Sequence, residues 1–282
     1  MRLSIIIPTL DRPEALTRLI DRLRIFRTGD VEMVIVDDSK VPLPENYLNE
    51  SGEKLTYLHR GVKLGVSSAR NLGSHHSKGE YLIFLDDDDA VAESWLEDFY
   101  SSLGNDQDLV YCNMRLVAPS GKETSVSASK NNRGIVIPGA WMIRKAIFDQ
   151  VGGFDERLKF AENTELFFRL DQLPLKKQYI EKGNFIYHQS PDGGSKNLQN
   201  MLDSIRLILK KHDDYLSPHV KHLYHQNIGV IEMRFGRFGP ARKHLWKSWI
   251  FKPQKISTLI RIALAYFPVV ARKIYTYEIG LR

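Results

Sequence analysis

Residues 81–89 are the stretch that most constrains the fold, because an apolar segment of strand length ends there in four consecutive aspartates. Tyr81 to Leu85 are apolar or aromatic without polar alternation, which is typical of a strand buried on both faces of a parallel sheet. The carboxylates of Asp86 to Asp89 would then lie at the carboxyl end of that strand. In open α/β sheets, ligands bind at this end.

Short apolar segments alternate with helical patterns over the first two thirds of the chain. The alternation predicts an α/β fold, with a mostly parallel, Rossmann-like sheet flanked by helices. Residues 118–134 are polar and are expected to form a loop. Strands are expected at residues 3–7, 31–36, 55–58, 81–85, 109–117, 179–181 and 185–187, and helices are expected to begin near Pro13, Ser67, Glu93, Lys145 and Asn163.

From Asn197 onward the apolar residues keep helical spacing, so we expect an α/β domain over residues 1–195 and a helical region over 196–282. Residues 241–282 hold nine Lys or Arg against one acid, Glu278. Since the whole chain carries +6, the rest is slightly acidic, at six minus eight, or minus two. A basic helical segment can contact nucleic acid, an anionic membrane or an acidic partner.

Composition and missing motifs exclude several classes of protein. A hydrophobic content of 43% is enough for a sizeable core. The single cysteine, Cys112, excludes a disulfide framework and a multi-cysteine zinc site.

The sequence predicts no targeting or membrane-spanning segment. The first apolar run stops at Pro8 and is too short for a signal peptide, and no run reaches the roughly 20 residues that span a bilayer. We therefore expect a cytoplasmic protein. A glycine-rich phosphate loop is missing after the first strand, which disfavours dinucleotide oxidoreductases and P-loop enzymes.

The acidic run suggests a cation site. Asp86 and Asp88 point the same way if strand geometry persists, and Asp87 then points elsewhere. Carboxylate oxygens suit Mg²⁺ or Mn²⁺, which complete their coordination with water and phosphate. The alternative is that the acids only cap the helix that begins after Ala92, but one acid would suffice for that.

Other polar residues near the expected strand ends have two interpretations each. Asp37 and Asp38 follow the second strand and could bond a base or ribose, or form a turn. Arg70 could contact phosphate or base, or lie on the surface as a solvated cation. His188 could be a further metal or diphosphate ligand, or a structural residue.

Four segments, in this order, resemble the successive motifs of the family 2 inverting glycosyltransferases. They are Ser4–Thr9 (SIIIPT), Val34–Ser39 (VIVDDS), Gly65–Gly73 (GVSSARNLG) and Phe84–Asp89 (FLDDDD). Gly139–Ala140 and Val151–Glu156 (VGGFDE) resemble that family's acceptor-side segment. The similarity covers roughly residues 1–195 and implies a type A glycosyltransferase fold.

The resemblance also implies residue roles. Thr9, Asp11 and Asp38 would lie near the base and ribose, and Asp86 to Asp88 would form the DxD motif that binds the metal and diphosphate. Mn²⁺ or Mg²⁺ is the expected cofactor. Its candidate ligands are Asp86 and Asp88, together with His188, which its position alone suggests. The implied donor is a nucleotide-diphosphate sugar, and a UDP-sugar is favoured.

The chain departs from the family at the expected base. Asn163 stands where the family has an aspartate, and an amide cannot accept a proton usefully. We predict that Glu162 acts as the base, with Glu165 as the second candidate. The alternatives are a base from the acceptor loop, poor turnover, or a purely structural role for both acids at the start of their helix.

The sequence therefore predicts a metal-dependent inverting hexosyltransferase. The expected acceptor is a hydroxyl of a glycan or lipid-linked molecule in surface polysaccharide or glycolipid synthesis, with the basic helical region near an anionic membrane. The competing hypothesis is a non-catalytic nucleotide-sugar-binding protein, which Asn163 suggests. A nucleic-acid partner is not expected, because the excess of basic over acidic residues is confined to the last helices and no nucleic-acid motif is present.

Overall fold

The computed structural model describes residues 2–24, 30–44, 54–103, 106–129, 135–188 and 197–276. Two compact units make up the chain: residues 1–156 together with 162–190, and residues 157–161 together with 191–282. The boundary predicted between residues 195 and 196 lies outside the described residues.

The first unit is built around a mixed sheet with the strand order β3-β2-β1-β4-β8-β6-β9-β5, and β7 pairs with β6. Neighbouring strands are parallel from β3 through β4 and again between β6 and β9. Strand β8 runs antiparallel to β4 and β6. The predicted α/β class is confirmed. The strands are β1 (Leu3–Thr9), β2 (Val31–Asp37), β3 (Leu55–His59), β4 (Tyr81–Phe84), β5 (Ala90–Val91), β6 (Leu109–Val117), β7 (Glu123–Val126), β8 (Trp141–Arg144) and β9 (Lys177–His188).

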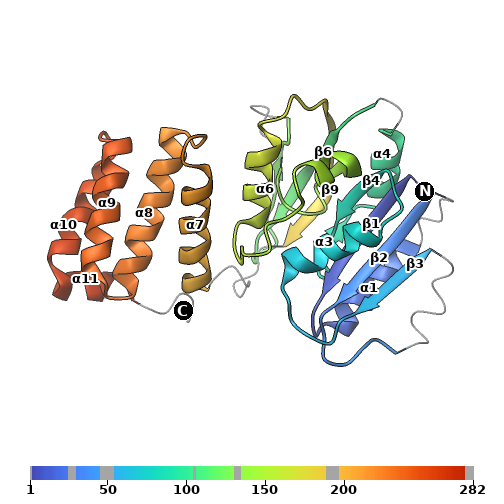
Figure 1. The fold of residues 1–282 in the computed structure, drawn as a ribbon, viewed down its shortest axis with the longest axis horizontal. Coiled ribbons are helices and arrows are strands. Elements are labelled where there is room, and N and C mark those ends of the chain that lie inside the picture. Colours follow the sequence, from blue (N-terminus) through green and yellow to red (C-terminus); the bar gives the residue numbers. More distant parts are fainter. Residues whose placement is uncertain are drawn as a thin grey trace. The chain divides into compact units, whose positions relative to one another are not determined.

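Helices flank this sheet (Figure 1). The helix that begins at Pro13 buries its predicted apolar face, including Leu16, Leu19 and Leu23. Proline suits this first helical position because its missing N–H would have no helical partner there. The helices of this unit are α1 (Pro13–Arg24), α3 (Val66–His76), α4 (Trp95–Ser101), α5 (Lys145–Gln150) and α6 (Glu162–Leu170).

Three local predictions differ from the structure. The segment 118–134 is not all loop, because β7 pairs with β6 through backbone bonds that side-chain patterning does not report. The two short strands expected around Gly183 are one strand, β9, in which irregular pairing with β6 near Asn113 accommodates the glycine. Strand β4 ends at Phe84, and a turn follows in which Asp89 N–H donates to Asp86 O at 3.0 Å.

Aromatic rings fill the core beneath the carboxyl end of β4. The Phe84 ring lies 5.1 Å from the rings of Phe148 and Phe154 and 5.5 Å from that of Trp141. Gly139 approaches this core with φ +82°, and a Cβ there would lie 2.5 Å from the Phe185 ring. Only glycine fits this left-handed, crowded position before β8.

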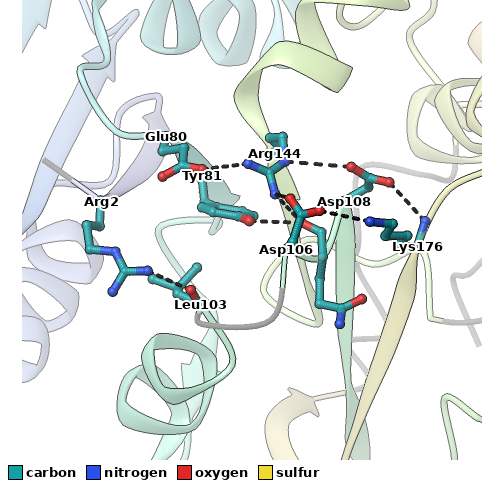
Figure 2. Close-up of polar contacts among 9 residues, drawn as sticks. Arg2, Glu80, Tyr81, Leu103, Asp106, Asp108, Arg144 and Lys176 are labelled. Atoms are coloured by element: carbon teal, nitrogen blue, oxygen red, sulfur yellow. Dashed lines mark hydrogen bonds and ion pairs between the residues drawn. The ribbon is translucent and has the colours of Figure 1, made fainter.

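The amino end of β4 is closed by a network of ion pairs (Figure 2). Arg144 is the last residue of β8. Its guanidinium lies 2.5 Å from the Glu80 carboxylate and 2.8 Å from the Asp106 carboxylate. Lys176 Nζ contacts the other Asp106 oxygen at 2.8 Å and holds the pKa of that carboxyl below its usual value. The guanidinium also covers the Tyr81 ring at 4.9 Å. These charges neutralise one another at the edge opposite the carboxyl ends of the parallel strands.

The second unit is a row of helices, with α7, α8, α9 and α10 side by side in chain order (Figure 1). Asn197 caps α7 by accepting from Asn200 N–H at 2.9 Å, and Ser217 caps α8 in the same way. Within the described residues, no helix has the length and apolar character to cross a bilayer. The helices are α7 (Leu198–His212), α8 (Pro218–Arg234), α9 (Phe238–Phe251), α10 (Ile256–Tyr266) and α11 (Pro268–Ile274).

A pair of histidines lies between α8 and α9. Because these histidines titrate, we expect the protein to lose stability in acid. His225 Nδ1 lies 3.0 Å from His244 Nδ1, and the Phe251 ring stacks on His225. Burial lowers the pKa of both imidazoles to about 4. The unfolded chain binds these protons near pH 6.5, so stability falls between pH 6.5 and 4, by about 2 to 4 kcal/mol for the pair after allowance for partial exposure.

Urea unfolding at pH 7 and pH 5 checks this prediction. His244→Gln keeps a partner for His225 and removes one titrating group, so its loss of unfolding free energy should be smaller than that of the wild type. His75→Gln, at an exposed position of α3, is the control and should lose as much as the wild type. Equal losses in all three proteins would contradict the assignment.

Candidate functional site

The candidate site lies where the parallel strands β1, β2 and β4 end. Thr9 and Asp37 are the last residues of β1 and β2 and pair in register. Asp38 N–H donates to Thr9 O at 3.0 Å, which holds the two strand ends together. The acidic run begins two residues after Phe84 on the neighbouring strand β4. The sheet therefore gathers the predicted polar residues at one edge.

The carboxylates of the acidic run have different partners. Asp87 is buried and accepts a hydrogen bond from Thr9 Oγ1 at 2.7 Å. Asp88 has a side chain 60% exposed and pairs with Arg12 at 2.6 Å, while Asp86 pairs with Arg70 at 2.5 Å. The alternation that would point Asp86 and Asp88 the same way does not hold, because Asp86 turns to Arg70 while Asp87 and Asp88 share Arg12. The physical reason is that the run is a turn rather than a continued strand.

Repulsion and burial shape the protonation of this turn. Burial raises the pKa of the Asp89 carboxyl well above its usual value, and the charge of Asp86 raises it further. Burial also raises the pKa of Asp87, although Thr9 and Arg12 oppose the shift. The turn therefore brings together more carboxyl groups than the nearby cations and hydrogen-bond donors can stabilise in the ionised form.

A buried guanidinium connects the acidic run to helix α6. Arg70 projects from α3, is 1% exposed, and donates to Asp86 and, at 3.1 Å, to Glu162 Oε1. Its guanidinium also lies 5.4 Å from the centre of the Phe154 ring. The interpretation of Arg70 as a solvated surface cation is therefore wrong.

The first turn of α6 separates the two candidate bases. Glu162 has a side chain 15% exposed and accepts from Arg70 and from Asn163 Nδ2, the latter at 3.0 Å. Glu165 is fully buried and its carboxylate pairs with Arg169 at 2.7 Å. Glu162 therefore has the access to solvent that a base for an incoming hydroxyl requires, and Glu165 does not.

The backbone before α6 supports this placement. Ala161, with φ +58°, is one of three non-glycine residues with positive φ in the described ranges. Asp11, with φ +53°, is another and lies beside Arg12. Such conformations cost about 1 kcal/mol or more and concentrate at functional sites. Both strained positions directly precede charged residues of the candidate site.

The two aspartates after β2 have separate environments. Asp37 accepts from Tyr57 Oη at 2.5 Å and from Ser39 N–H, so it fixes the turn. Asp38 accepts from Arg60 Nε at 2.5 Å and from Leu64 N–H at 3.0 Å. The turn interpretation fits Asp37, and Asp38 draws the segment before α3 towards the site.

Two residues at the site carried no predicted role. Arg12 contacts Asp88 and also Asp87, the latter at 3.2 Å. A cation three residues after Thr9, at the same strand end, was the available signal. Asn71 donates to Phe154 O at 2.9 Å and accepts from Phe154 N–H, so it anchors the segment after Gly153 beside α3.

Asp11 and His188 also lie at the edge formed by the carboxyl ends of the parallel strands, and both are exposed. Asp11 is exposed, and its N–H donates to Ser39 Oγ at 2.7 Å. His188 is exposed at the end of β9, two residues after Ile186, which pairs with Ala90. Among the described residues, no three His, Cys, Asp or Glu side chains already surround a common metal position.

The oxygen donors nevertheless fit a hard divalent cation. Asp86 and Asp88 keep 36% and 60% of their side chains exposed, so each has oxygen surface free to bind. Mg²⁺ and Mn²⁺ typically take one or two carboxylates and obtain their remaining ligands from phosphate and water. The residues present match that requirement.

Comparison with known proteins gives consistent matches. The sequence matches Glycosyl transferase family 2 over residues 4–152. An uncharacterized glycosyltransferase of Rickettsia prowazekii is 24% identical over 228 residues, 74% of this chain and 71% of that protein. Poly(ribitol-phosphate) beta-N-acetylglucosaminyltransferase TarP of Staphylococcus aureus is 32% identical over 223 residues, 74% of this chain and 58% of that protein.

The solved structures include S. aureus TarS 1–349 in complex with UDP-GlcNAc. It matches with a TM-score of 0.69 and 16% identity, covering 97% of this chain and 92% of that one. A second structure of the same TarS fragment, in complex with UDP, matches with a TM-score of 0.61. At this level of identity the likeness shows the fold.

Proposed function

Because the chain belongs to glycosyl transferase family 2 and is a glycosyltransferase with the type A fold, we propose that it transfers a sugar with inversion from a metal-bound nucleotide-diphosphate donor. One observation carries the metal-dependent part of this proposal. Four carboxylates, those of Asp86, Asp87, Asp88 and Glu162, face two arginines, Arg12 and Arg70. A diphosphate brought into this surplus of negative charge requires a counter-ion.

Asp86 and Asp88, with His188 at the same edge, would hold that cation. Mn²⁺ or Mg²⁺ in this position would stabilise the charge that develops on the departing nucleoside diphosphate. Thr9, Asp11 and Asp38 are proposed to contact the nucleotide, since they lie around the same strand ends, and the buried Arg70 is proposed to hold Asp86 in place beside it. Asp87 has its carboxylate bound by Thr9 and Arg12, which suits a positioning role in the DxD motif.

Glu162 is proposed as the base. It takes the proton of an acceptor hydroxyl whose oxygen forms a bond to the anomeric carbon, on the face opposite the diphosphate. The bond from that carbon to the diphosphate oxygen breaks, and its electron pair leaves with the nucleotide. Arg70 and Asn163 hold one carboxylate oxygen of Glu162, which orients the residue for this step.

The donor and acceptor are proposed by analogy with the matched proteins. TarS is described in complexes with UDP-GlcNAc and UDP, and TarP is named as a beta-N-acetylglucosaminyltransferase. We therefore favour a UDP-sugar. The proposed acceptor is a hydroxyl of a glycan or lipid-linked molecule in surface polysaccharide or glycolipid synthesis, at the cytoplasmic side of the membrane where nucleotide sugars are available.

Thermal shift measurements test the donor and metal together. UDP, GDP, dTDP and CMP are each added with and without Mn²⁺. UDP at about a hundred times its Kd should stabilise the fold by about 2.7 kcal/mol, which raises Tm by about 5 to 10 °C, and should do so only with Mn²⁺. Equal stabilisation by UDP with and without the metal would contradict metal-dependent donor binding.

A non-catalytic nucleotide-sugar-binding protein is the second candidate, and Asn163 is the observation that favours it. Such a protein would bind UDP with Mn²⁺ but would neither transfer the sugar nor hydrolyse the donor. Release of UDP from UDP-GlcNAc, measured with and without a glycan acceptor, separates the two candidates. Any metal-dependent release above the background of boiled protein supports the enzyme.

A further inference from the structure

Helix α10 presents its more apolar face to solvent. Thr258, Ile262 and Ala265 are buried against the rest of the helical unit, and two of these three side chains are small or polar. With 100° of rotation per residue, the other side of the helix gathers large apolar residues within an arc of roughly 120°. They are Ile256, Leu259, Ile260 and Tyr266, which are 39% to 71% exposed, and Phe267 directly after them is 65% exposed.

Helix α11 extends the same surface. Val269, Val270 and Ile274 are 47% to 75% exposed, and only Ala271 of this helix is buried. A surface helix normally turns its apolar face to the core, so this arrangement is inverted. Contiguous exposed apolar side chains of this kind mark an interaction site. We call this surface, Ile256 to Ile274 on its exposed side, the α10–α11 face.

The charge around the face is of one sign. Residues 252–276 contain no Asp or Glu and five cations, Lys252, Lys255, Arg261, Arg272 and Lys273. Lys255 is exposed at the start of α10, and Arg272 and Lys273 are exposed on α11. The apolar residues therefore have exposed cations at both ends.

We propose that the α10–α11 face docks on an anionic lipid bilayer. An interfacial helix buries apolar side chains at the boundary between headgroups and acyl chains, while flanking Lys and Arg bind acidic headgroups. The outward-facing apolar side of α10 supplies the apolar side chains, and the cations of the α10–α11 face, which have no neighbouring acids in residues 252–276, supply the contacts to acidic headgroups. A second copy of the chain fits less well, because symmetric contact would bring cations against cations without acids to pair them.

Docking would place the helical unit at the surface from which a lipid-linked acceptor is presented. Access to a lipid-linked acceptor matters only if the proposed sugar transfer is correct, whereas docking on the bilayer does not depend on that transfer. The two are separable because lipid binding is measured without donor, acceptor or metal.

Co-sedimentation of the full chain with vesicles tests the proposal. The wild type should bind vesicles of mixed phosphatidylcholine and phosphatidylglycerol, and should bind pure phosphatidylcholine far more weakly. The triple variant Lys255→Gln, Arg272→Gln, Lys273→Gln should bind the acidic vesicles about a hundredfold more weakly, since each cation near an anionic surface contributes about fivefold. The triple variant Ile256→Ser, Ile260→Ser, Phe267→Ser should also lose binding at unchanged charge.

The matched control removes three exposed cations elsewhere: Arg18→Gln, Lys122→Gln, Lys210→Gln. It should bind acidic vesicles within about threefold of the wild type, because all the cations of the α10–α11 face are unchanged. Melting curves by circular dichroism establish that each variant is folded. Equal loss of binding in the control and the face variants would overturn the proposal. So would absence of binding to acidic vesicles, or a dimer in light scattering that Ile260→Ser dissociates.

Discussion

Replacing Glu162 by glutamine is expected to lower kcat for sugar transfer by about 10²- to 10⁴-fold, the usual contribution of a positioned general base. Glutamine keeps the shape of the side chain, and its carbonyl oxygen can still accept from Arg70 and Asn163. The amide cannot take the hydroxyl proton. Nucleotide affinity with Mn²⁺ should change by less than about threefold, because the removed function acts on the acceptor side.

Steady-state kinetics and nucleotide titration are measured on the same preparation. Glu97→Gln is the matched control, since Glu97 is exposed on α4 and lies outside the candidate site. Its kcat should remain close to that of the wild type. A Glu162→Gln enzyme with wild-type turnover would end the assignment of Glu162 and would direct attention to a base from elsewhere.

Replacing Asp88 by asparagine is expected to abolish the Mn²⁺-dependent stabilisation by UDP and to lower transfer by at least about 10²-fold. The Asp88 side chain is 60% exposed, so the metal-free fold should keep its Tm. The amide is neutral and a weaker cation ligand, so the surplus negative charge that attracts the metal is reduced. At about a hundred times Kd, the missing stabilisation is about 2.7 kcal/mol.

Asp89→Asn is the control one residue along the chain. The Asp89 carboxylate accepts from Asp86 N–H, and its raised pKa reflects burial and repulsion, so the charged form is disfavoured in the folded protein. An amide oxygen can accept the same bond without charge. This variant should keep Mn²⁺-dependent stabilisation by UDP. If Asp88→Asn and Asp89→Asn behave alike, the site does not select Asp88 as a ligand.

The strands and the edge that gathers the site were predictable from the sequence. Unbroken apolar runs such as Ile5–Ile7 and Tyr81–Leu85 identify strands buried on both faces, and parallel strands place their carboxyl ends together. The position of Thr9, Asp38 and Asp86 at one edge follows from that rule. Strand β7 was missed, because Glu123–Val126 has no apolar alternation and forms through backbone pairing with β6.

The partners of the charged residues were not predictable from spacing. The rule that side chains alternate along a strand does not apply after Phe84, because the chain turns there. The direction of Asp86 depends on its ion pair with Arg70, and that of Asp88 on its ion pair with Arg12. Arg70 could equally have been a surface cation. Its burial depends on the approach of α3 and α6, which lie 92 residues apart in sequence at the contact with Glu162.

The sequence by itself determined the family, the α/β fold and the acidic edge, because motifs and hydrophobic periodicity are local properties of the chain. The tertiary structure decided which carboxylates remain exposed, that Glu162 rather than Glu165 opens to solvent, and that α10 turns its apolar side outward. These depend on which surfaces of distant segments meet. Packing determines burial, and burial determines which charges can bind a ligand.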